Sequence, residues 1–232
     1  MSLTVSGLSA GYEGTPILRD VDCTVAEGEI VGVVGRNGVG KTTLLKTIMG
    51  LLEPSEGTVQ FNGTDVTSEP ANVHAQSGIG YVPQGRDVFS GLSVEQNLLI
   101  GENVGTGEET LYNRVYEYFP ILEERADQDA GTMSGGQQQM LAIGRALVGD
   151  PDLLLVDEPS EGVQPSIVQS ITEDLKQINE ELGTTILFVE QNLSVIEGLA
   201  ERCYAMDHGT MVDELDAESL ANRDHLEEYL VV

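Results

Sequence analysis

Apolar and polar positions alternate near the start of the chain and repeat at a longer spacing near its end. Leu3, Val5 and Leu8 alternate with other residues, which is typical of a strand with one buried face. Between Pro165, which suits the first turn of a helix, and Gly183, which suits a helix end, apolar residues recur about every 3.6 residues. They are Val168, Ile171, Leu175, Ile178 and Leu182, and they predict a helix.

Short continuous apolar runs mark further strands. Such runs are typical of strands that are buried on both faces of a parallel sheet. Because helical patterns such as 41–51 separate the runs, we expect a mostly parallel sheet covered by helices. These runs predict strands at 29–34, 79–82, 153–156 and 185–189. Two further strands are expected at 17–25 and at 58–61, and a turn at Asn62–Gly63 follows the second of these two.

The middle of the chain has helical patterns without strands between them. Ser93–Gln96 has the Ser-x-x-Gln spacing of a capping box, and 97–100 continues that helix. A second helix covers 111–119 and stops at Pro120, and a third covers 137–148. These patterns predict an all-helical segment at this point of the chain.

This segment, 86–149, is interpreted as a helical subdomain inserted into an α/β frame. The frame consists of 1–85 and 150–232. Its last stretch, from about Cys203, is expected to form a small hairpin and terminal helices.

The charge of the chain excludes two classes of partner. Among 232 residues, 39 are Asp or Glu and 11 are Lys or Arg, so the net charge is −28. That field repels a phosphate backbone, so we expect no nucleic-acid partner, and it also opposes docking on anionic lipid by charge alone. The acidic composition, with lysine only at Lys41, Lys46 and Lys176, resembles that of cytoplasmic proteins of salt-loving microbes. A merely acidic protein from an ordinary microbe is the alternative.

The sequence shows no pattern of a secreted, metal-clustering or membrane-spanning protein. Cys23 and Cys203 lie far apart, and no Cys/His spacing indicates a metal site or a disulfide framework. No basic segment followed by an apolar one opens the sequence, so we expect no secretory signal. The apolar runs are far shorter than the roughly 20 residues of a spanning helix. We expect an intracellular protein that is soluble when isolated and meets a membrane only through a partner.

A glycine-rich segment carries the strongest chemical signal. Gly35–Thr42 fits the pattern G-x-x-x-x-G-K-S/T, and it stands between an expected strand and an expected helix. Glycines let the backbone wrap a polyphosphate with its N–H groups pointing inward. Lys41 would neutralise the β- and γ-phosphates, and the Thr42 hydroxyl would bind Mg²⁺. The alternative is a glycine-rich turn without a ligand.

Two carboxylates follow the buried run 153–156. Asp157 and Glu158 would lie at the end of a strand where open α/β sheets bind ligands. Asp157 would hold Mg²⁺, and Glu158 would orient or deprotonate the attacking water. In so acidic a chain a plain strand end is the alternative, but the glycine-rich segment favours the functional interpretation.

A second phosphate-binding segment is expected at the start of the helix after Met133. Ser134–Gln137 combines small residues with a helix N-terminus, which attracts anions. The inserted helical subdomain would hold it well away from Lys41. Two phosphate-binding segments on separate faces indicate that a nucleotide is shared between two subunits.

These motifs together resemble those of ATP-binding-cassette (ABC) transporter ATPases, nearly from end to end. The resemblance matches Gly35–Thr42 to the Walker A loop, 153–158 to Walker B with Glu158 as the catalytic glutamate, and Ser134–Gln137 to the family signature. It implies one domain, 1–232, with a RecA-like P-loop fold, an N-terminal antiparallel β subdomain and the helical subdomain. It also implies ATP and Mg²⁺ as cofactors.

Further site residues come from the same resemblance. Gln84 matches the Q-loop, which touches Mg²⁺ and senses the transmembrane partner, and Tyr12 matches the aromatic residue that stacks on adenine. A surface tyrosine is the alternative for Tyr12. The implied nucleotide-binding residues are Tyr12, Gly35, Arg36, Asn37, Gly38, Val39, Gly40, Lys41, Thr42, Thr43, Ser134, Gly135, Gly136 and Gln137; the implied catalytic residues are Lys41, Gln84, Glu158 and Gln191; and the implied Mg²⁺ ligands are Thr42, Gln84 and Asp157.

Longer segments indicate a subfamily. Residues 82–89, 134–147 and 189–192 resemble ATPases of branched-chain amino acid and urea importers, and Gly35–Gly40 with Glu161–Ser166 resembles the urea type more closely. The resemblance implies an ATPase at the cytoplasmic face of the membrane, whose partners are a second ATPase subunit (identical or different) and transmembrane permease subunits. An extracellular solute-binding protein is an indirect partner. An importer of another small polar solute is the alternative.

Two positions depart from the family pattern. Most members have a histidine where this sequence has Gln191, and Gln can donate a hydrogen bond but carries no charge. The D-loop, which usually ends in Asp, is Ser160–Gln164 here. The subfamily that the chain resembles shares the change to Gln191, which is interpreted as a feature of that lineage, but Gln191 also keeps open a nucleotide-operated interaction or regulatory subunit with weak turnover. The altered D-loop leaves communication between the subunits open.

Other classes fit less well. Family relatives in DNA repair or on ribosomes usually carry long insertions or two fused cassettes, which 232 residues do not hold. A GTPase is disfavoured because no Asn-Lys-x-Asp element occurs. His74, His208 and His225 fall outside every motif and are interpreted as structural or surface residues.

Overall fold

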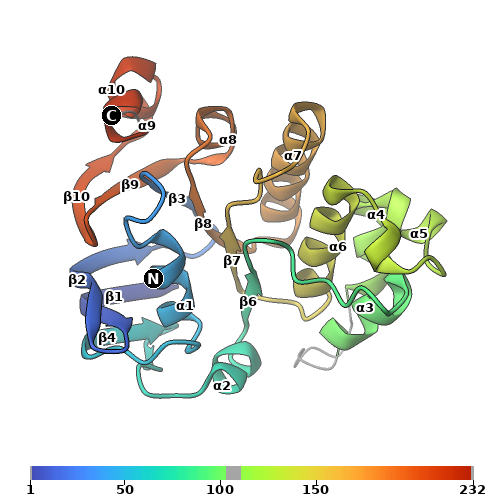
Figure 1. Cartoon of the computed structure of the whole chain (residues 1–232), viewed down its shortest axis with the longest axis horizontal. Helices are drawn as coiled ribbons and strands as arrows, with labels where there is room; N and C mark the ends of the chain where they lie inside the picture. Colours follow the sequence, from blue (N-terminus) through green and yellow to red (C-terminus); the bar gives the residue numbers. More distant parts are fainter. Residues whose placement is uncertain (1, 103–110, 231–232) are drawn as a thin grey trace.

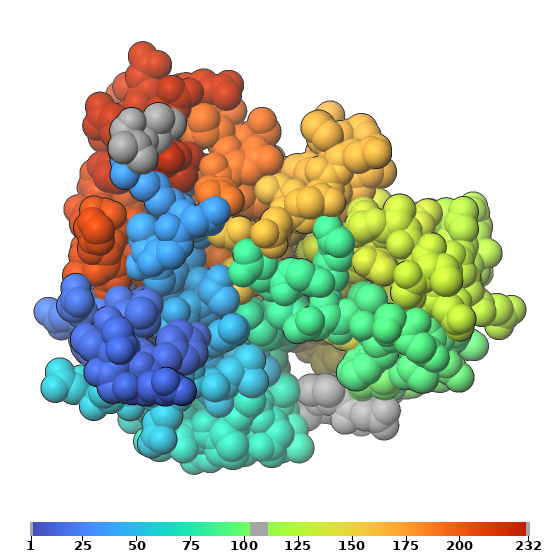
Figure 2. Space-filling model, viewed as in Figure 1, coloured from blue at the N-terminus to red at the C-terminus, as the bar shows by residue number. Residues whose placement is uncertain are grey.

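The computed structural model describes residues 2–102 and 111–230, which form two sheets and a set of helices (Figure 1). The predicted domain 1–232 includes residues 1, 103–110 and 231–232, which lie outside the described residues. Of these, 103–110 also belong to the predicted helical subdomain 86–149. Figure 2 shows two lobes: one carries the N- and C-terminal segments, the other the middle of the chain.

The smaller sheet is antiparallel and is made by the N-terminal part of the chain. Its strand order is β2-β1-β4-β5, and β1 pairs with both β2 and β4. The expected turn joins β4 to β5, with positive φ at both Asn62 and Gly63. The expectation of an N-terminal antiparallel β subdomain is confirmed. Its strands are β1 (Leu3–Tyr12), β2 (Thr15–Val25), β4 (Glu56–Phe61) and β5 (Thr64–Asp65).

The larger sheet has the order β10-β9-β3-β8-β7-β6, with every pairing parallel except that of β9 with β10. Its central strands are buried on both faces. In β3, for example, Val31 and Val33 join the core beside the small sheet, while Ile30 and Val34 join the core beneath the helices. The mostly parallel sheet is therefore confirmed. Its strands are β3 (Ile30–Val34), β6 (Ile79–Val82), β7 (Leu153–Asp157), β8 (Thr185–Glu190), β9 (Arg202–Asp207) and β10 (Thr210–Leu215).

Four helices of the middle segment form a lobe of their own, here called the helical lobe (Figure 1). Pro120 ends one helix, as expected, but it also begins the next. The first and last helices approach closely at Gly101, where a Cβ would lie only 2.0 Å from the carbonyl oxygen of Arg145. The four are α3 (Val94–Glu102), α4 (Tyr112–Tyr118), α5 (Pro120–Glu124) and α6 (Gly135–Leu147), and a short 3₁₀ turn, Ala130–Thr132, precedes the last.

The remaining helices lie against the larger sheet or follow it. Two of them, α2 and α8, were missing from the sequence-based expectation, whereas the long helix ending at Gly183 and the terminal hairpin and helices were expected. In the described part of the chain every helix is too short or too polar to cross a bilayer. The bounds are α1 (Lys41–Ile48), α2 (Ala71–Gln76), α7 (Pro165–Leu182), α8 (Leu193–Leu199), α9 (Ala217–Leu220) and α10 (Arg223–Leu230).

Candidate active site

The glycine-rich loop connects β3 to α1, as its sequence predicts. α1 begins at Lys41 directly after Gly40, whose φ of 117° is disfavoured for any residue with a Cβ. Gly38 also has a positive φ, and a Cβ built on it would meet nothing within 4 Å. The loop therefore presents backbone rather than side chains to an open space at the N-terminus of a helix, which suits an anion.

Lys41 lies inside this loop rather than in solvent. Its Nζ donates to the carbonyl oxygens of Gly35 at 2.7 Å and Arg36 at 3.1 Å, and the residue is only 4% exposed. The same Nζ forms an ion pair with Glu158 Oε1 at 3.1 Å. The two predicted catalytic groups therefore touch, and a polyphosphate at the loop would compete with Glu158 for the ammonium.

The two carboxylates stand at the end of β7 as predicted. Glu158 has a left-handed φ of 46°, and its backbone N–H donates to the Val189 carbonyl at 3.0 Å. Gln84 Nε2 donates to the free side of this carboxylate, Oε2, at 3.4 Å. Since non-glycine residues rarely adopt this backbone conformation, the surrounding contacts hold Glu158 in a defined place at the strand end.

Asp157 is 1% exposed, and both of its oxygens accept hydrogen bonds. Thr42 Oγ1 donates to Oδ1 at 3.0 Å, and the Tyr81 hydroxyl donates to Oδ2 at 3.2 Å. Burial raises the pKa of this carboxyl, and the two hydrogen bonds offset part of that increase. Tyr81 lies in the expected strand 79–82, but no sequence pattern indicates its contact with Asp157.

A cavity of about 340 Å³ brings most of the predicted residues together. Tyr12, at the end of β1, lines this cavity and is 44% exposed, and Lys41 and Glu158 line it as well. An exposed ring, open glycine backbone, a helix N-terminus and a lysine are the groups that a base and a polyphosphate require. The cavity is lined by Tyr12, Ile17, Asn37, Gly38, Gly40, Lys41, Thr42, Thr43, Gln84 and Glu158.

The side chains near Thr42 also fit Mg²⁺. A hydroxyl and a carboxylate already meet at 3.0 Å, and Mg²⁺ prefers such hard oxygen donors and takes the rest of its ligands from phosphates and water. Among the described residues no group of three His, Cys, Asp or Glu side chains could hold a metal by itself. The residues thus suit a cation that arrives with a nucleotide.

Glu190 is a further member of the site that sequence reasoning missed. It is fully buried, and Oε1 accepts from the Ser160 N–H at 3.0 Å. Its Oε2 accepts from the N–H groups of Gln191 and Asn192, both at 2.8 Å. This carboxylate therefore joins the loop after β7 to the loop after β8.

The predicted signature segment lies at the start of α6, in the helical lobe. Ser134 caps the helix: Gln137 N–H donates to Ser134 Oγ at 3.3 Å, and Ser134 N–H donates to Gln137 Oε1 at 3.0 Å. Ser134 is exposed, and none of Ser134–Gln137 lines the cavity at Lys41. Because its hydroxyl oxygen accepts this bond, the hydroxyl hydrogen stays available to a ligand.

Some predicted residues do not face the cavity. Val39 is buried in the apolar core beside the small sheet, so it contributes backbone at most. Gln191 is exposed on the loop after β8, and Asp157 stands behind Thr42. Gly35 is buried, since a Cβ there would lie 2.4 Å from the Met206 carbonyl oxygen.

Comparison with known proteins decides the family. Residues 18–161 match the family model described as ABC transporter. The chain belongs to this family of ATP-hydrolysing cassettes. The match includes the glycine-rich loop, the signature segment and both carboxylates of the ABC ATPase.

Curated relatives cover almost the whole ABC ATPase. It is 43% identical over 212 residues to the high-affinity branched-chain amino acid transport ATP-binding protein BraG of Pseudomonas aeruginosa, covering 90% of this chain and 91% of that one. It is 36% identical over 222 residues to a probable branched-chain amino acid transport ATP-binding protein, LivF, of Archaeoglobus fulgidus, covering 95% and 94%. A methionine import protein, MetN, of Brucella abortus is 35% identical over 205 residues, which cover 86% of this chain and 56% of that protein.

Solved structures share the fold. A nucleotide-free ATP-binding cassette from an ABC transporter superposes with a TM-score of 0.85 at 27% identity, covering 100% of this chain and 99% of that one. A dimeric cassette in a post-hydrolysis state, bound to ADP and Pi, gives a TM-score of 0.82 at 26% identity, covering 93% and 98%. The ABC cassette fold is therefore shown for this chain.

Proposed function

We propose that this ABC ATPase drives an importer of branched-chain amino acids. The observation that carries the proposal is the 43% identity to a branched-chain amino acid transport ATP-binding protein along nine-tenths of both chains. The second relative with this description, at 36% identity, supports it. The site itself does not indicate the transported solute, because its residues are suited to bind a nucleotide.

Two subunits would share each ATP. The cavity at Lys41 offers the loop, the lysine and Glu158, whereas Ser134 is exposed on another lobe and cannot serve the same cavity as the structure stands. A dimeric relative bound to ADP and Pi supports this arrangement. The partner's signature segment would complete the pocket, and Ser134–Gln137 would complete the partner's; the partner is a second copy or a different ATPase.

Hydrolysis needs the Lys41–Glu158 pair to separate. Phosphate oxygens would attract the Lys41 ammonium, and the released Glu158 would then align water for in-line attack, with Gln84 holding its other oxygen. Lys41 and the backbone N–H groups of the loop would stabilise charge on the transferred phosphoryl group. Tyr12 would stack on adenine.

Mg²⁺ would be held by Thr42 and Asp157, which already touch, and by Gln84, which lines the same cavity as Thr42. When bound, it neutralises phosphate charge and polarises the bond that breaks. The chain's own contribution is to fix the hydroxyl and the carboxylate at contact distance before the nucleotide arrives.

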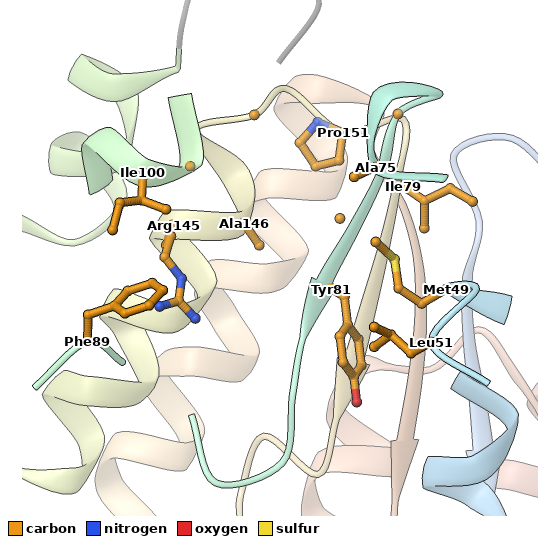
Figure 3. Close-up of a pocket in the computed structure, with 14 residues that line it drawn as sticks. Met49, Leu51, Ala75, Ile79, Tyr81, Phe89, Ile100, Arg145, Ala146 and Pro151 are labelled. Atoms are coloured by element: carbon orange, nitrogen blue, oxygen red, sulfur yellow. The ribbon is translucent and has the colours of Figure 1, made fainter. Parts of the chain in front are cut away.

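A groove of about 320 Å³ between the two lobes offers a contact for the membrane subunits. Figure 3 shows Leu51 and Tyr81 on one wall and Phe89 and Ile100 on the other. Three of these side chains are at least a third exposed: Leu51 at 55%, Phe89 at 47% and Ile100 at 37%. Arg145 stacks on Phe89, with its Cζ 5.0 Å from the ring centroid, and supplies a cation on that wall.

The groove would take an apolar segment of the permease, and this contact would hold the ATPase at the cytoplasmic face of the membrane. Relatives described as transport ATP-binding proteins support a membrane partner. The groove is an exposed apolar surface on a protein with a net charge of −28, and this also favours an apolar protein partner over a charged one. Tyr81 lines this groove and also contacts Asp157, so the contact lies next to the catalytic site.

Other solutes and weak turnover are the competing proposals. Urea rests on the sequence of the glycine-rich loop and of 161–166, and methionine on the 35% identical relative. A regulatory subunit with weak turnover rests on Gln191, whose uncharged side chain is exposed in the structure.

Uptake measurements separate these proposals. In cells whose own gene carries Glu158→Gln, we expect leucine uptake to fall to background while urea and methionine uptake continue, because the variant binds ATP without hydrolysing it. Loss of urea or methionine uptake with leucine uptake intact would contradict the branched-chain proposal. Full leucine uptake in the variant would favour the regulatory subunit.

The groove is tested with a matched pair of variants. Leu51→Asp places a charge in the groove, and Val212→Asp places one at a side chain that is 51% exposed on β10, away from it. We expect leucine uptake to be lost only in Leu51→Asp, while ATP hydrolysis by the isolated chain stays at the wild-type rate in both. Equal uptake in the two variants would contradict the groove as the permease contact.

A further inference from the structure

The guanidinium of Arg86 lies between two segments that belong to different motifs. Its Nη2 donates to the carbonyl oxygens of Glu161 at 2.9 Å and Gly162 at 3.1 Å, in the loop after β7. On the signature side it faces Gly135, where a Cβ would lie 3.1 Å from Nη1 and 3.2 Å from both Cζ and Nη2. Only a residue without a side chain leaves this plane undisturbed.

The backbone around Arg86 is strained in a way that serves this placement. Arg86 and Asp87 both have left-handed φ values, 76° and 43°, which non-glycine residues seldom adopt in succession. The turn directs one side chain to the loop after β7 and leaves the Asp87 carbonyl to accept from Arg145 Nη1 of α6 at 2.9 Å. The segment after Gln84 is thus attached to the helical lobe as well as to the sheet.

One donor of the Arg86 guanidinium has no hydrogen-bond partner among the described residues. This donor is Nε, which is buried. A buried unpaired donor lowers stability, so local stability alone does not explain this arrangement. Geometry explains it better: Nη2 donates to both carbonyls, while the flat face of the guanidinium lies against Gly135.

The contacts of Arg86 link both halves of the site. Two residues before it, Gln84 contacts Glu158, and the carbonyls it binds follow Glu158 by three and four residues. We propose that Arg86 is a positioning residue that couples the Gln84–Glu158 contact to the placement of 160–164 and of the signature segment. The inference rests on the proposed sharing of ATP, because those two segments would face the second subunit.

Arg86→Ala and Arg86→Lys in the full-length chain test this role. Arg86 does not line the cavity, so we expect the Kd for Mg-ATP to stay within about twofold of wild type in both variants. The kcat for ATP hydrolysis should fall roughly tenfold to a hundredfold in Arg86→Ala, because the reacting groups are misplaced. Arg86→Lys keeps a charge that can reach the carbonyls but lacks the planar guanidinium that lies against Gly135. Its kcat should therefore lie between those of the wild type and of Arg86→Ala. Arg223→Ala, at an exposed position of α10, is the matched control and should keep the wild-type kcat.

The outcomes separate a positioning role from a structural one. A wild-type kcat in either Arg86 variant would overturn the proposal, and so would a Kd for Mg-ATP that rises by the same factor as kcat falls. Where Arg86→Ala does not fold, as judged by thermal unfolding, Arg86→Lys decides by the same split between kcat and Kd. The changes in kcat and in Kd can be measured whether or not the wild-type chain hydrolyses ATP cooperatively, as shared ATP would require. Absence of cooperativity in the wild type would therefore contradict ATP sharing, whereas an unchanged kcat in the variants would contradict the role of Arg86.

Discussion

Buried polar side chains fix the loops of the active site residue by residue. Glu190 has no solvent contact, yet its two oxygens accept three backbone N–H groups from Ser160, Gln191 and Asn192. A carboxylate has enough lone pairs for three donors, whereas an amide offers one oxygen and two donors of its own. The geometry of both loops therefore depends on the acceptor oxygens and the shape of one side chain.

Replacing Glu190 by Gln tests this dependence. The amide nitrogen cannot accept, so either the Ser160 N–H or the pair from Gln191 and Asn192 loses its partner. We expect the kcat of ATP hydrolysis to fall at least about tenfold while Mg-ATP still binds, because the loops shift relative to Glu158. Steady-state kinetics and nucleotide titration measure the two quantities.

Glu201→Gln is the control for this substitution. Its carboxylate accepts one backbone N–H, from Ile30 at 3.1 Å, and lies at the other end of β3. We expect its kcat to match wild type. Equal kcat values for the Glu190 and Glu201 variants would contradict the assigned role of Glu190.

At the scale of elements, two helices of the helical lobe begin with the same capping device. Ser93 and Gln96 exchange hydrogen bonds of 3.0 and 3.1 Å at the start of α3, and Ser134 and Gln137 do so at the start of α6. The device satisfies two N–H groups that a helix otherwise leaves unpaired. Its occurrence twice allows its structural effect to be separated from catalysis.

Ser93→Ala and Ser134→Ala should each lower the free energy of unfolding by about 1 kcal/mol, because each removes an N-cap acceptor. Only Ser134→Ala should also lose ATP hydrolysis, since only its hydroxyl would face a partner's nucleotide. Urea unfolding and ATPase rates measure the two effects. If both variants hydrolyse ATP at the same rate, Ser134 acts as a helix cap alone.

Helix α7 carries a carboxyl whose ionisation opposes folding. Burial, with a smaller contribution from Glu173, raises the pKa of Asp174 from 3.8 to about 6. The folded chain therefore binds a proton that the unfolded chain has lost between these two values, so stability decreases as pH rises through this range. Above it, the folded state carries a partly buried charge next to the carboxylate of Glu173.

Asp174→Asn removes this cost, and we expect a pH-dependent gain. After allowance for solvent screening of a partly exposed group, the variant should gain roughly 0.5–1 kcal/mol of unfolding free energy at about pH 7.5 and little at about pH 4. Urea unfolding at both pH values measures it. The exposed Asp127→Asn should show no such pH-dependent difference, and a gain for Asp174→Asn that is equal at both pH values would contradict this explanation.

The sequence predicted the elements with strong patterns and missed those without them. The apolar runs of the large sheet and the period of α7 are signals that burial requires. Helix α2 buries only His74, so it has no apolar period to detect. Helix α8 buries Val195, Ile196 and Leu199 behind the cap Asn192, which is a weaker signal than the period of α7.

The site follows the same division. Motif spacing predicted the positions of the loop between β3 and α1 and of the two carboxylates at the end of β7, because each motif is local in sequence. Tyr81, Arg86 and Glu190 act through contacts between residues 30 to 76 positions apart, which no local pattern records. In a chain with 39 acidic residues, nothing in the sequence distinguishes Glu190, whose carboxylate is fully buried.

At the scale of the whole molecule, the net charge of −28 dominates. Charges of one sign on a compact surface repel one another, and unfolding relieves the repulsion by separating them. Few ion pairs among the described residues offset this repulsion, because the chain has only 11 Lys and Arg residues. Arg202, for example, pairs with Glu29 and Glu214 beside the larger sheet. Stability should therefore depend on the salt concentration.

We expect the thermal unfolding midpoint to rise by several degrees between about 0.1 M and about 2 M KCl. The screening length falls from about 10 Å at 0.1 M to about 3 Å at 1 M, so repulsion between surface carboxylates is largely removed. Chloride is preferred to sulfate, which also strengthens apolar burial. A midpoint that stays constant or falls would contradict a stability limited by self-repulsion.

One phenol ring has a consequence that extends across the molecule. Tyr81 lines the groove between the lobes, while its hydroxyl donates to Asp157 Oδ2. If a permease segment in the groove moves this ring, it changes the hydrogen bonding of the carboxylate proposed to hold Mg²⁺. Thermodynamic linkage then requires the reverse effect of the same size: nucleotide and cation binding at Asp157 would alter the affinity of the groove for the membrane subunit.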